Sequence, residues 1–320
     1  MSKKGQPRSF RTEDDENVNR KATHVRESLS HRFQEFLLKN ETFGRLHSLQ
    51  VKVTFHKARL QSFFVDSRAG LEFSQWRCSL SSSSVNAISA NNSGKQRLFD
   101  MMQTIAAQMD SETSAFTFTD SQPKALDLCM APGGFLAYFF HKSPAGVADA
   151  ITLPEEEGGH QVLLSLDGRK AQINVVFADV TMYAAELGVE SIPKNHPEAH
   201  RLLALWPHPK CSYDLLICDG QALRTQNVPE YRKLCEQSRL FNSQLLIALQ
   251  KVRVGGTIIA LLHKAHKWRT FALLRQFSKF SDIVVFKPKK FHAEKSSFYM
   301  VAKNVRSQSR EATDAIESFR

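Results

Sequence analysis

The sequence predicts an α/β domain built on a mostly parallel, seven-stranded sheet and preceded by an N-terminal extension. From residue 124 onward, short apolar runs alternate with stretches of helical spacing, which is the pattern of a parallel sheet covered by helices. The last two runs are joined only by the segment PKKFHAEK, which is too short to hold a crossover helix. The final strand is therefore expected to pair antiparallel with its neighbour, as half of a hairpin.

The first third of the chain lies outside this alternation. Residues 1–30 are polar and of mixed charge, which predicts a disordered leader, and they lack the apolar core of a secretory signal. Residues 31–94 form an extension of unknown role, with helical spacing over 30–43 and strand-like alternation over 49–55.

The main domain is expected over residues 95–304, followed by a C-terminal tail over 305–320. It opens with a helix over 95–109 that has an apolar stripe, made of Leu98, Met101, Met102, Ile105 and Ala106. The strands that follow are expected over residues 125–129, 147–152, 173–179, 213–219, 257–263, 282–287 and 296–303. The helices between them are expected over residues 133–140, 229–252 and 268–280.

The composition narrows the class of protein. Hydrophobic residues make up 42% of the chain, which suits a globular fold, and the five cysteines form no C-x-x-C pair. No window approaches the roughly 18 apolar residues of a membrane span. The chain is therefore expected to be intracellular, in the cytoplasm or nucleus, without a membrane segment, a disulfide framework or a bound metal.

The formal net charge of +11 is concentrated toward the C-terminus. Residues 251–320 contain 15 Lys and Arg against 5 Asp and Glu, a net charge of +10, so the first 250 residues are close to neutral. A basic section on a near-neutral body favours a partner that carries phosphates, such as RNA. A solvated basic surface that only keeps the protein soluble explains the same charges, and both interpretations stay open.

The stretch ALDLCMAPGGF places a carboxylate at the end of a buried strand and a nearly bare backbone directly after it. In an open α/β sheet, ligands bind beyond the carboxyl ends of the strands. Pro132 pre-sets the turn, while Gly133 and Gly134 let a ligand approach the main chain and the free N–H groups of the next helix. The spacing is neither G-x-G-x-x-G nor that of a P-loop. The ligand should therefore carry a cation for Asp127 and a carboxylate for the N–H groups.

S-adenosyl-L-methionine carries both a sulfonium and an aminoacyl group, and it is the cofactor that this stretch predicts. At two other strand ends, Asp179 could accept a hydrogen bond from the adenine amino group, and Thr152 offers a hydroxyl to the ribose. An ordinary acid that caps the helix is the alternative for Asp127. The predicted cofactor contacts come from Asp127, Ala131, Pro132, Gly133, Gly134, Phe135, Thr152 and Asp179.

Four segments together resemble the FtsJ family of RNA ribose 2'-O-methyltransferases: DLCMAPGGF, CDGQ, VGGTIIALLHK and FKPKKFHAEKSSFYMVAKN. The resemblance covers residues 95–304 in the family's order and approximate spacing, and LPEEEGGH with CDGQALRTQ is similar to a fungal-type branch. It implies a Rossmann-like, seven-stranded methyltransferase fold that uses S-adenosyl-L-methionine and acts on RNA.

The resemblance also implies a catalytic site, because the family uses a Lys-Asp-Lys-Glu tetrad to place and deprotonate the ribose hydroxyl. Asp219 falls on the family's Asp and Lys264 on its second Lys, whereas Ser297 stands at the position of the Glu. The first Lys would fall at Phe99 and Asp100. Asp219 and Lys264 are therefore the expected catalytic residues, with help from Ser297 or water. The incomplete tetrad leaves open another acceptor, such as a protein or small molecule, or a member that only binds.

Basic residues near the strand ends form the predicted RNA-binding rim, made of Lys267, Arg269, Lys287, Lys289 and Lys290. A solvated basic face is the alternative interpretation of these residues. Trp268 and Phe291 could stack on bases, whereas the strand alternation favours a core position for Tyr299.

Overall fold

The structure, a computed structural model, describes residues 32, 35, 92–166, 168, 172–202, 206–207, 212–223 and 226–320. The expected leader, the strand over 49–55 and most of the helix over 30–43 lie outside these residues; Arg32 and Glu35 are helical. The chain divides into two compact units, Met1–Gly70 with Lys264–Ala272, and Leu71–His263 with Leu273–Arg320. The second unit holds the sheet.

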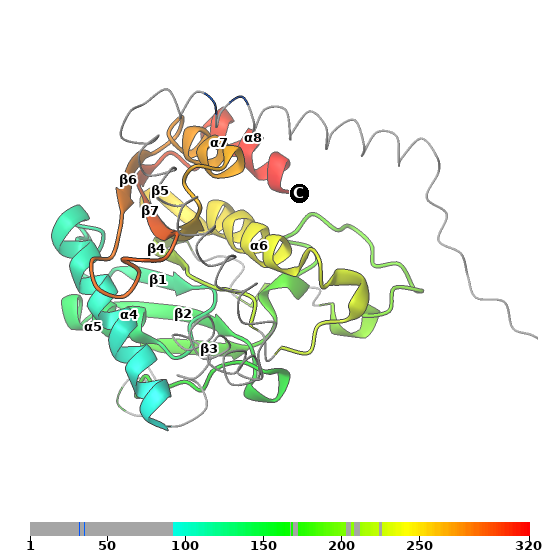
Figure 1. The fold of residues 1–320 in the computed structure, drawn as a ribbon, viewed down its shortest axis with the longest axis horizontal. Coiled ribbons are helices and arrows are strands. Elements are labelled where there is room, and N and C mark those ends of the chain that lie inside the picture. Colours follow the sequence, from blue (N-terminus) through cyan, green and yellow to red (C-terminus); the bar gives the residue numbers. More distant parts are fainter. Residues whose placement is uncertain are drawn as a thin grey trace, which may run out of the picture. The chain divides into compact units, whose positions relative to one another are not determined.

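Among the described residues, seven strands form one sheet in the order β3-β2-β1-β4-β5-β7-β6 (Figure 1). Their bounds are β1 Lys124–Asp127, β2 Val147–Thr152, β3 Ile173–Phe177, β4 Tyr213–Cys218, β5 Val252–His263, β6 Asp282–Phe286 and β7 Ser297–Val305. Neighbouring strands pair parallel, except that β7 is antiparallel to both β5 and β6. The predicted sheet and its terminal hairpin are confirmed.

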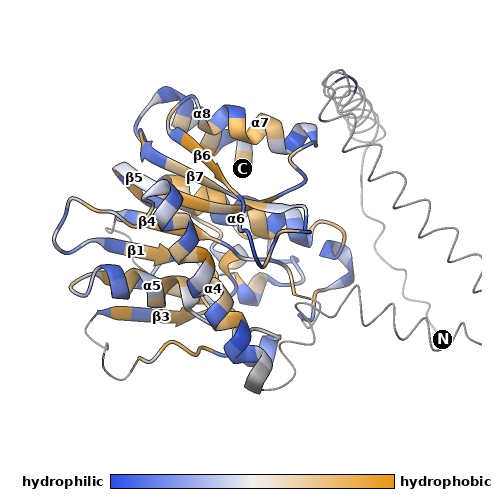
Figure 2. Ribbon diagram, turned by 60° about the vertical axis from the view of Figure 1, so that its left-hand side comes forward, coloured by the Kyte–Doolittle hydropathy of each residue, from blue (hydrophilic) through white to orange (hydrophobic). Residues whose placement is uncertain are grey.

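Helices cover both faces of the sheet, because its central strands bury side chains on both sides. Ala125 and Leu215 pack toward α4 and α5, whereas Leu126 and Leu216 pack toward α6, α8 and the C-terminal half of α7. The helix bounds are α4 Asn92–Thr113, α5 Gly134–Lys142, α6 Glu236–Lys251, α7 Trp268–Phe277 and α8 Arg310–Phe319. Figure 2 shows the hydrophobic colour concentrated along the strands, while the helices carry both colours.

The two largest differences from the expected element boundaries are at the starts of β5 and α6. β5 begins at Val252 rather than after the glycine pair, so the strand continues through both glycines. Gly255 has a φ of +82°. The pairing shifts register here with both neighbouring strands, between Val252 and Thr257 against β4 and between Gly256 and Ile258 against β7, which is typical of a bulge. The helix expected from residue 229 begins instead at Glu236, after the short 3-10 helix Glu230–Arg232 that follows Pro229.

The expected C-terminal tail contains a further helix, α8. The hydroxyl of Ser309 accepts a hydrogen bond from the N–H of Ala312 at 3.2 Å and so caps the helix start. Ala312 and Ala315 are buried against the α6 side of the sheet, so α8 completes the core. No helix among the described residues combines the length and apolar character needed to cross a membrane.

Candidate active site

A cavity of about 360 Å³ lies at the carboxyl edge of the parallel strands, within the second unit. From β1, the chain adds β2 and β3 on one side of the sheet and then β4 and the later strands on the other side. The strand order therefore switches at β1, and ligands of open α/β sheets bind at such a point. The volume is in the range of pockets for small molecules and cofactors. Among the predicted site residues, those that line the cavity are Ala131, Pro132, Thr152, Asp179, Asp219 and Ser297.

Gly133 and Gly134 lie next to the cavity but do not line it. Gly133 has a φ of +102°, and a Cβ there would lie 2.8 Å from Cβ of Leu164. A Cβ on Gly134 would lie 2.5 Å from both the carbonyl oxygen of Phe99 and Cβ of Met102, on α4. Close packing of the protein on itself therefore accounts for both glycines, and their contact with a cofactor stays a prediction.

The remainder of the APGG turn is fixed by hydrogen bonds to its backbone. Thr152 accepts a bond from the N–H of Ala131 at 3.3 Å through its hydroxyl oxygen. The carbonyl of Pro132 accepts from the N–H groups of Leu163 and Leu164 at 3.0 and 3.2 Å. Phe135, the residue after the glycines, is buried in the core with its ring edge toward Tyr299 and does not line the cavity.

Asp127, at the end of β1, is 1% exposed. Oδ1 accepts a hydrogen bond from the N–H of Cys129 at 3.3 Å, but Oδ2 has no hydrogen-bond partner among the described residues. Burial raises the pKa of this carboxyl group to about 8; the bond from Cys129 acts in the opposite direction, and the charge of Asp219 adds a smaller rise. Asp127 does not line the cavity, but a cation bound there would stabilise its ionised form.

Asp179 is fixed by groups that the sequence did not indicate. Oδ1 accepts hydrogen bonds from the N–H and hydroxyl of Thr181, at 2.9 and 2.6 Å. Oδ2 lies 3.8 Å from the guanidinium of Arg232, which is 3% exposed and also lies 3.4 Å from Glu198 and 3.6 Å from Glu236. Removing one member of such a buried ion cluster leaves the other charges unpaired. Arg232 is far from Asp179 in the sequence, so no local motif could identify it.

Asp219, which follows β4, receives a hydrogen bond on Oδ1 from the hydroxyl of Tyr299 at 2.9 Å. Burial raises the pKa of Asp219 to about 7, while the bond from Tyr299 favours the ionised form. The next residue, Gly220, is held by the buried side chain of Gln244: its N–H donates to Oε1 at 2.9 Å, and its carbonyl accepts from Nε2 at 3.2 Å. The turn that carries Asp219 is therefore held in one conformation.

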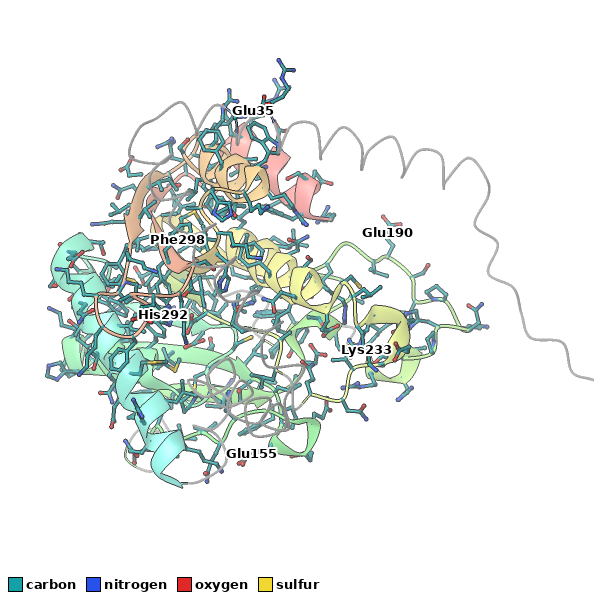
Figure 3. All side chains as sticks on the ribbon, viewed as in Figure 1. Glu35, Glu155, Glu190, Lys233, His292 and Phe298 are labelled. Atoms are coloured by element: carbon teal, nitrogen blue, oxygen red, sulfur yellow. The ribbon has the colours of Figure 1, made fainter. Side chains whose placement is uncertain are left out.

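Ser297, at the start of β7, is 2% exposed, and its Oγ lies 2.9 Å from Nδ1 of His292. His292 is labelled in Figure 3 and lies in the segment that joins β6 to β7. Its ring stacks on Tyr299 with centroids 6.0 Å apart and an interplanar angle of 20°. His292 lines the cavity together with Ser297 and Tyr299. Sequence reasoning missed His292, because it stands in a loop with no motif of its own.

The wall of the cavity formed by α4 is apolar, with Leu98, Met101, Met102 and Ile105 as its lining residues. Asp100, near the position of the family's first Lys, is exposed and accepts a hydrogen bond from Gln96 at 2.9 Å. No basic group of α4 lines the cavity. Among the described residues, no group of three or more His, Cys, Asp or Glu could hold a metal ion.

Lys264, Lys267 and Arg269 belong to the first unit. Lys264 directly follows β5, has a φ of +54° and accepts a hydrogen bond on its carbonyl from the N–H of Lys267 at 2.8 Å. The rings of Trp268 and Phe271 are 5.7 Å apart. The catalytic role of Lys264 and the RNA contacts of Lys267 and Arg269 stay predictions.

The other three lysines of the predicted rim lie in or beside the β6–β7 loop. Lys287 donates through Nζ to the carbonyls of Lys295 and Ser297, the latter at 2.8 Å, and burial lowers its pKa. Lys289 forms an ion pair with Glu112 at 2.8 Å. Lys290 has its Nζ 5.4 Å from the centroid of the Phe291 ring. Lys287 thus closes the loop, although all three lysines are exposed.

Comparison with known proteins gives one family match, to the FtsJ-like methyltransferases, over residues 107–305. No curated protein matches the chain. Among solved structures, it is similar to a protein assigned as a ribosomal RNA methyltransferase from Plasmodium falciparum, at 13% identity and a TM-score of 0.39, over 62% of this chain and 93% of that one. It is also similar to an rRNA methylase from Streptococcus thermophilus, at 10% identity and a TM-score of 0.36, over 64% of this chain and 95% of that one.

Proposed function

Since the chain belongs to the FtsJ-like methyltransferase family, we propose that it transfers the methyl group of S-adenosyl-L-methionine to ribose 2'-hydroxyls of RNA. S-adenosyl-L-methionine is the cofactor of this family, and when bound it supplies the methyl group as a sulfonium. The narrower assignment to a fungal-type branch and an intracellular location are parts of the proposal that rest on sequence alone.

The observation that carries the proposal is one shared cavity. Asp219, at the position of the family's catalytic Asp, lines the same cavity as four of the residues predicted to hold the cofactor, Ala131, Pro132, Thr152 and Asp179. A donor held by these four residues would therefore be close to the acid that positions the acceptor. Such proximity is what transfer between two bound groups requires.

The acids around this edge support a cationic donor. Burial raises the pKa values of Asp127 and Asp219 to about 8 and about 7, so in the absence of a cation both are partly protonated near neutral pH. A sulfonium and an ammonium group would favour their ionised forms. Asp127 and Asp179 would hold the donor, while Asp219 would accept a hydrogen bond from the acceptor hydroxyl and orient it.

Deprotonation of the acceptor requires a base, because the pKa of a ribose hydroxyl is far above neutral. In the family, a lysine of the tetrad contributes to this step, and Lys264 is the residue of this chain at that position. In the second unit, exposed Lys290 would meet RNA phosphates, and Lys289 would do so on release from Glu112. Lys267 and Arg269, in the first unit, are proposed as further phosphate contacts.

A second candidate keeps the cofactor but changes the acceptor to a small molecule or a protein side chain. The apolar wall of α4 favours it, because Leu98, Met101 and Met102 line the cavity near the position where the family has its first Lys. Such a wall would suit an acceptor with an apolar body better than a phosphodiester backbone.

The test measures cofactor binding by calorimetry and methyl transfer by a tritium assay on total RNA. Wild type is expected to bind S-adenosyl-L-methionine and to label RNA, whereas Asp219→Asn should bind the cofactor and label RNA about 100-fold more slowly. Asp314→Asn, an exposed carboxylate on α8, is the matched control. Cofactor binding without RNA labelling would overturn the RNA assignment, and label recovered in protein or small molecules would support the second candidate.

A further inference from the structure

We propose that His292 is a catalytic residue that accepts the proton of the acceptor hydroxyl, acting from the wall of the cavity where the family has its glutamate. This inference rests on the proposed function, because it concerns the deprotonation of the acceptor. The position of the family's Glu is occupied in this chain by Ser297.

A serine has no group that titrates near neutral pH, but here Ser297 contacts His292, whose imidazole can titrate. Ser297 Oγ lies 2.9 Å from Nδ1 of His292, and both side chains are buried, with 2% and 8% of their surface exposed. Both line the cavity that Asp219 also lines. A basic nitrogen is thus held at the wall where the acceptor hydroxyl would be oriented by Asp219.

Within the part of the chain that the structure describes, the contacts of the His292 ring leave one nitrogen, Nε2, for the acceptor. Nδ1 is occupied by Ser297, and the ring plane is fixed by the stacked ring of Tyr299. Tyr299 in turn donates its hydroxyl hydrogen to Asp219 at 2.9 Å, so the imidazole and the carboxylate are connected through one buried tyrosine. When Nδ1–H donates to Ser297 Oγ, Nε2 carries the lone pair, which is the form that a proton acceptor needs.

The charge state of the imidazole agrees with this role. Burial lowers the pKa of His292 to about 4, and the positive charges of Lys295, Lys287 and His263 contribute further to the decrease. The ring is therefore neutral at pH 7, so one of its nitrogens carries a lone pair. A base of such low pKa contributes at the lower end of what general bases supply, which is about 100-fold in rate.

The proposed step is balanced in atoms and charge. The acceptor oxygen forms a bond to the methyl carbon, and the carbon–sulfur bond breaks with its electron pair left on sulfur. The hydroxyl proton passes to Nε2 of His292 and from there to solvent. The products are a methyl ether, a neutral thioether and a regenerated imidazole.

The direct test is an NMR measurement of the His292 imidazole nitrogens at pH 7, with S-adenosylhomocysteine present and His292→Gln used for assignment. The expected result is a neutral ring with hydrogen on Nδ1 and an unprotonated Nε2. Hydrogen on Nε2, or a doubly protonated ring, would overturn the proposal. This readout does not depend on turnover.

Single-turnover kinetics supply the second test. His292→Gln should lower the rate of transfer about 100-fold while the dissociation constant for the cofactor stays within about 3-fold. Ser297→Ala should lower the rate less, because it removes only the group that orients the ring. The control is His141→Gln, an exposed histidine on α5, which should match wild type. An unchanged rate in His292→Gln, with a large loss in Lys264→Ala, would assign the base to Lys264 instead.

The two proposals fail in different ways. Wild type that binds the cofactor but labels no RNA contradicts the proposed function. The NMR measurement then still tests the protonation state and tautomer that the inference assigns to His292. Wild type that labels RNA at the same rate as His292→Gln contradicts only the inference about His292. A thermal melt of each variant shows whether a lowered rate comes from loss of folding. If His292→Gln does not fold, Ser297→Ala repeats the kinetic test with His292 intact.

Discussion

Asp127 is a carboxyl group whose ionisation opposes folding of the cofactor-free protein. Burial raises its pKa from 3.8 to about 8, so the unfolded chain loses its proton at a lower pH than the folded chain. The stability contributed by the protonated group is complete below pH 4 and is lost as the pH rises through 8. The same residue is the one predicted to meet the cation of the cofactor.

Replacement of Asp127 by Asn should therefore separate stability from binding. The amide can still accept the hydrogen bond from Cys129 and does not ionise. Between pH 5 and pH 8, the unfolding free energy of wild type should therefore fall by about 4 kcal/mol more than that of the variant. Binding of S-adenosyl-L-methionine should weaken. Urea unfolding at both pH values and calorimetry measure the two effects, with Asp314→Asn as the exposed control; a pH dependence equal to that of wild type would contradict the assigned cause.

The hydroxyl of Tyr299 controls the ionisation of Asp219. Because this hydroxyl donates to the carboxylate at 2.9 Å, it stabilises the ionised form against the effect of burial, and the pKa is about 7. Tyr299→Phe keeps the buried ring but removes the donor. We expect the pKa of Asp219 to rise by about one unit, which shifts the acid side of the pH–rate profile to higher pH. Carbon NMR of the Asp219 carboxyl group would report the shift directly, and an unmoved titration would argue against this bond.

At the scale of elements, α4 and α5 approach each other at a glycine. A Cβ at position 134 would lie 2.5 Å from the backbone oxygen of Phe99, and backbone on α4 cannot move aside as a flexible side chain could. The two helices cover one face of β1, directly beside the APGG turn. The shape of the turn therefore depends on how closely the helices pack.

Gly134→Ala should force α4 away from α5. We expect a decrease of about 2 kcal/mol in unfolding free energy, or roughly 5 °C in melting temperature, with weaker cofactor binding because the turn shifts. Gly168→Ala is the control, since a Cβ at that position meets nothing within 4 Å. Calorimetric melting measures the difference between the two variants. Equal melting temperatures would mean that the helices accommodate the methyl group without cost.

The sequence predicts these elements well and their tertiary contacts poorly. Strand pattern and connection length are local properties, so the sheet and the β6–β7 hairpin could be read from the chain. The contacts of Arg232 with Asp179 and of Gln244 with Gly220 join segments far apart in the chain, and no periodicity records such pairs. The same holds for Tyr299. The strand alternation predicts its core position, but its bond to Asp219 joins β7 to the residue after β4, and the strand order that brings these two together, with only β5 between them, is a tertiary property.

At the scale of the whole molecule, the lysines that contribute to the positive charge differ in their contacts: some hold backbone carbonyls, and others do not. Lys290 is exposed, with its Nζ over the ring of Phe291, so its charge can meet a phosphate. Lys287 instead donates to the carbonyls of Lys295 and Ser297 and holds the β6–β7 loop that contains His292. The net charge of +11 therefore overstates what is available to RNA.

Salt dependence distinguishes the two classes. If RNA lies along this rim, Lys290→Gln should reduce the slope of log Kd against log salt concentration by about 0.7, the value for one phosphate contact on a single strand. Lys287→Gln should leave that slope nearly unchanged but lower the melting temperature, because its ammonium group is held by the carbonyls of Lys295 and Ser297. Lys194→Gln, an exposed lysine outside the rim, is the charge-matched control. Each of the three variants removes one positive charge, but only Lys290→Gln removes a proposed phosphate contact. Equal slopes for all three would therefore mean that RNA binds elsewhere.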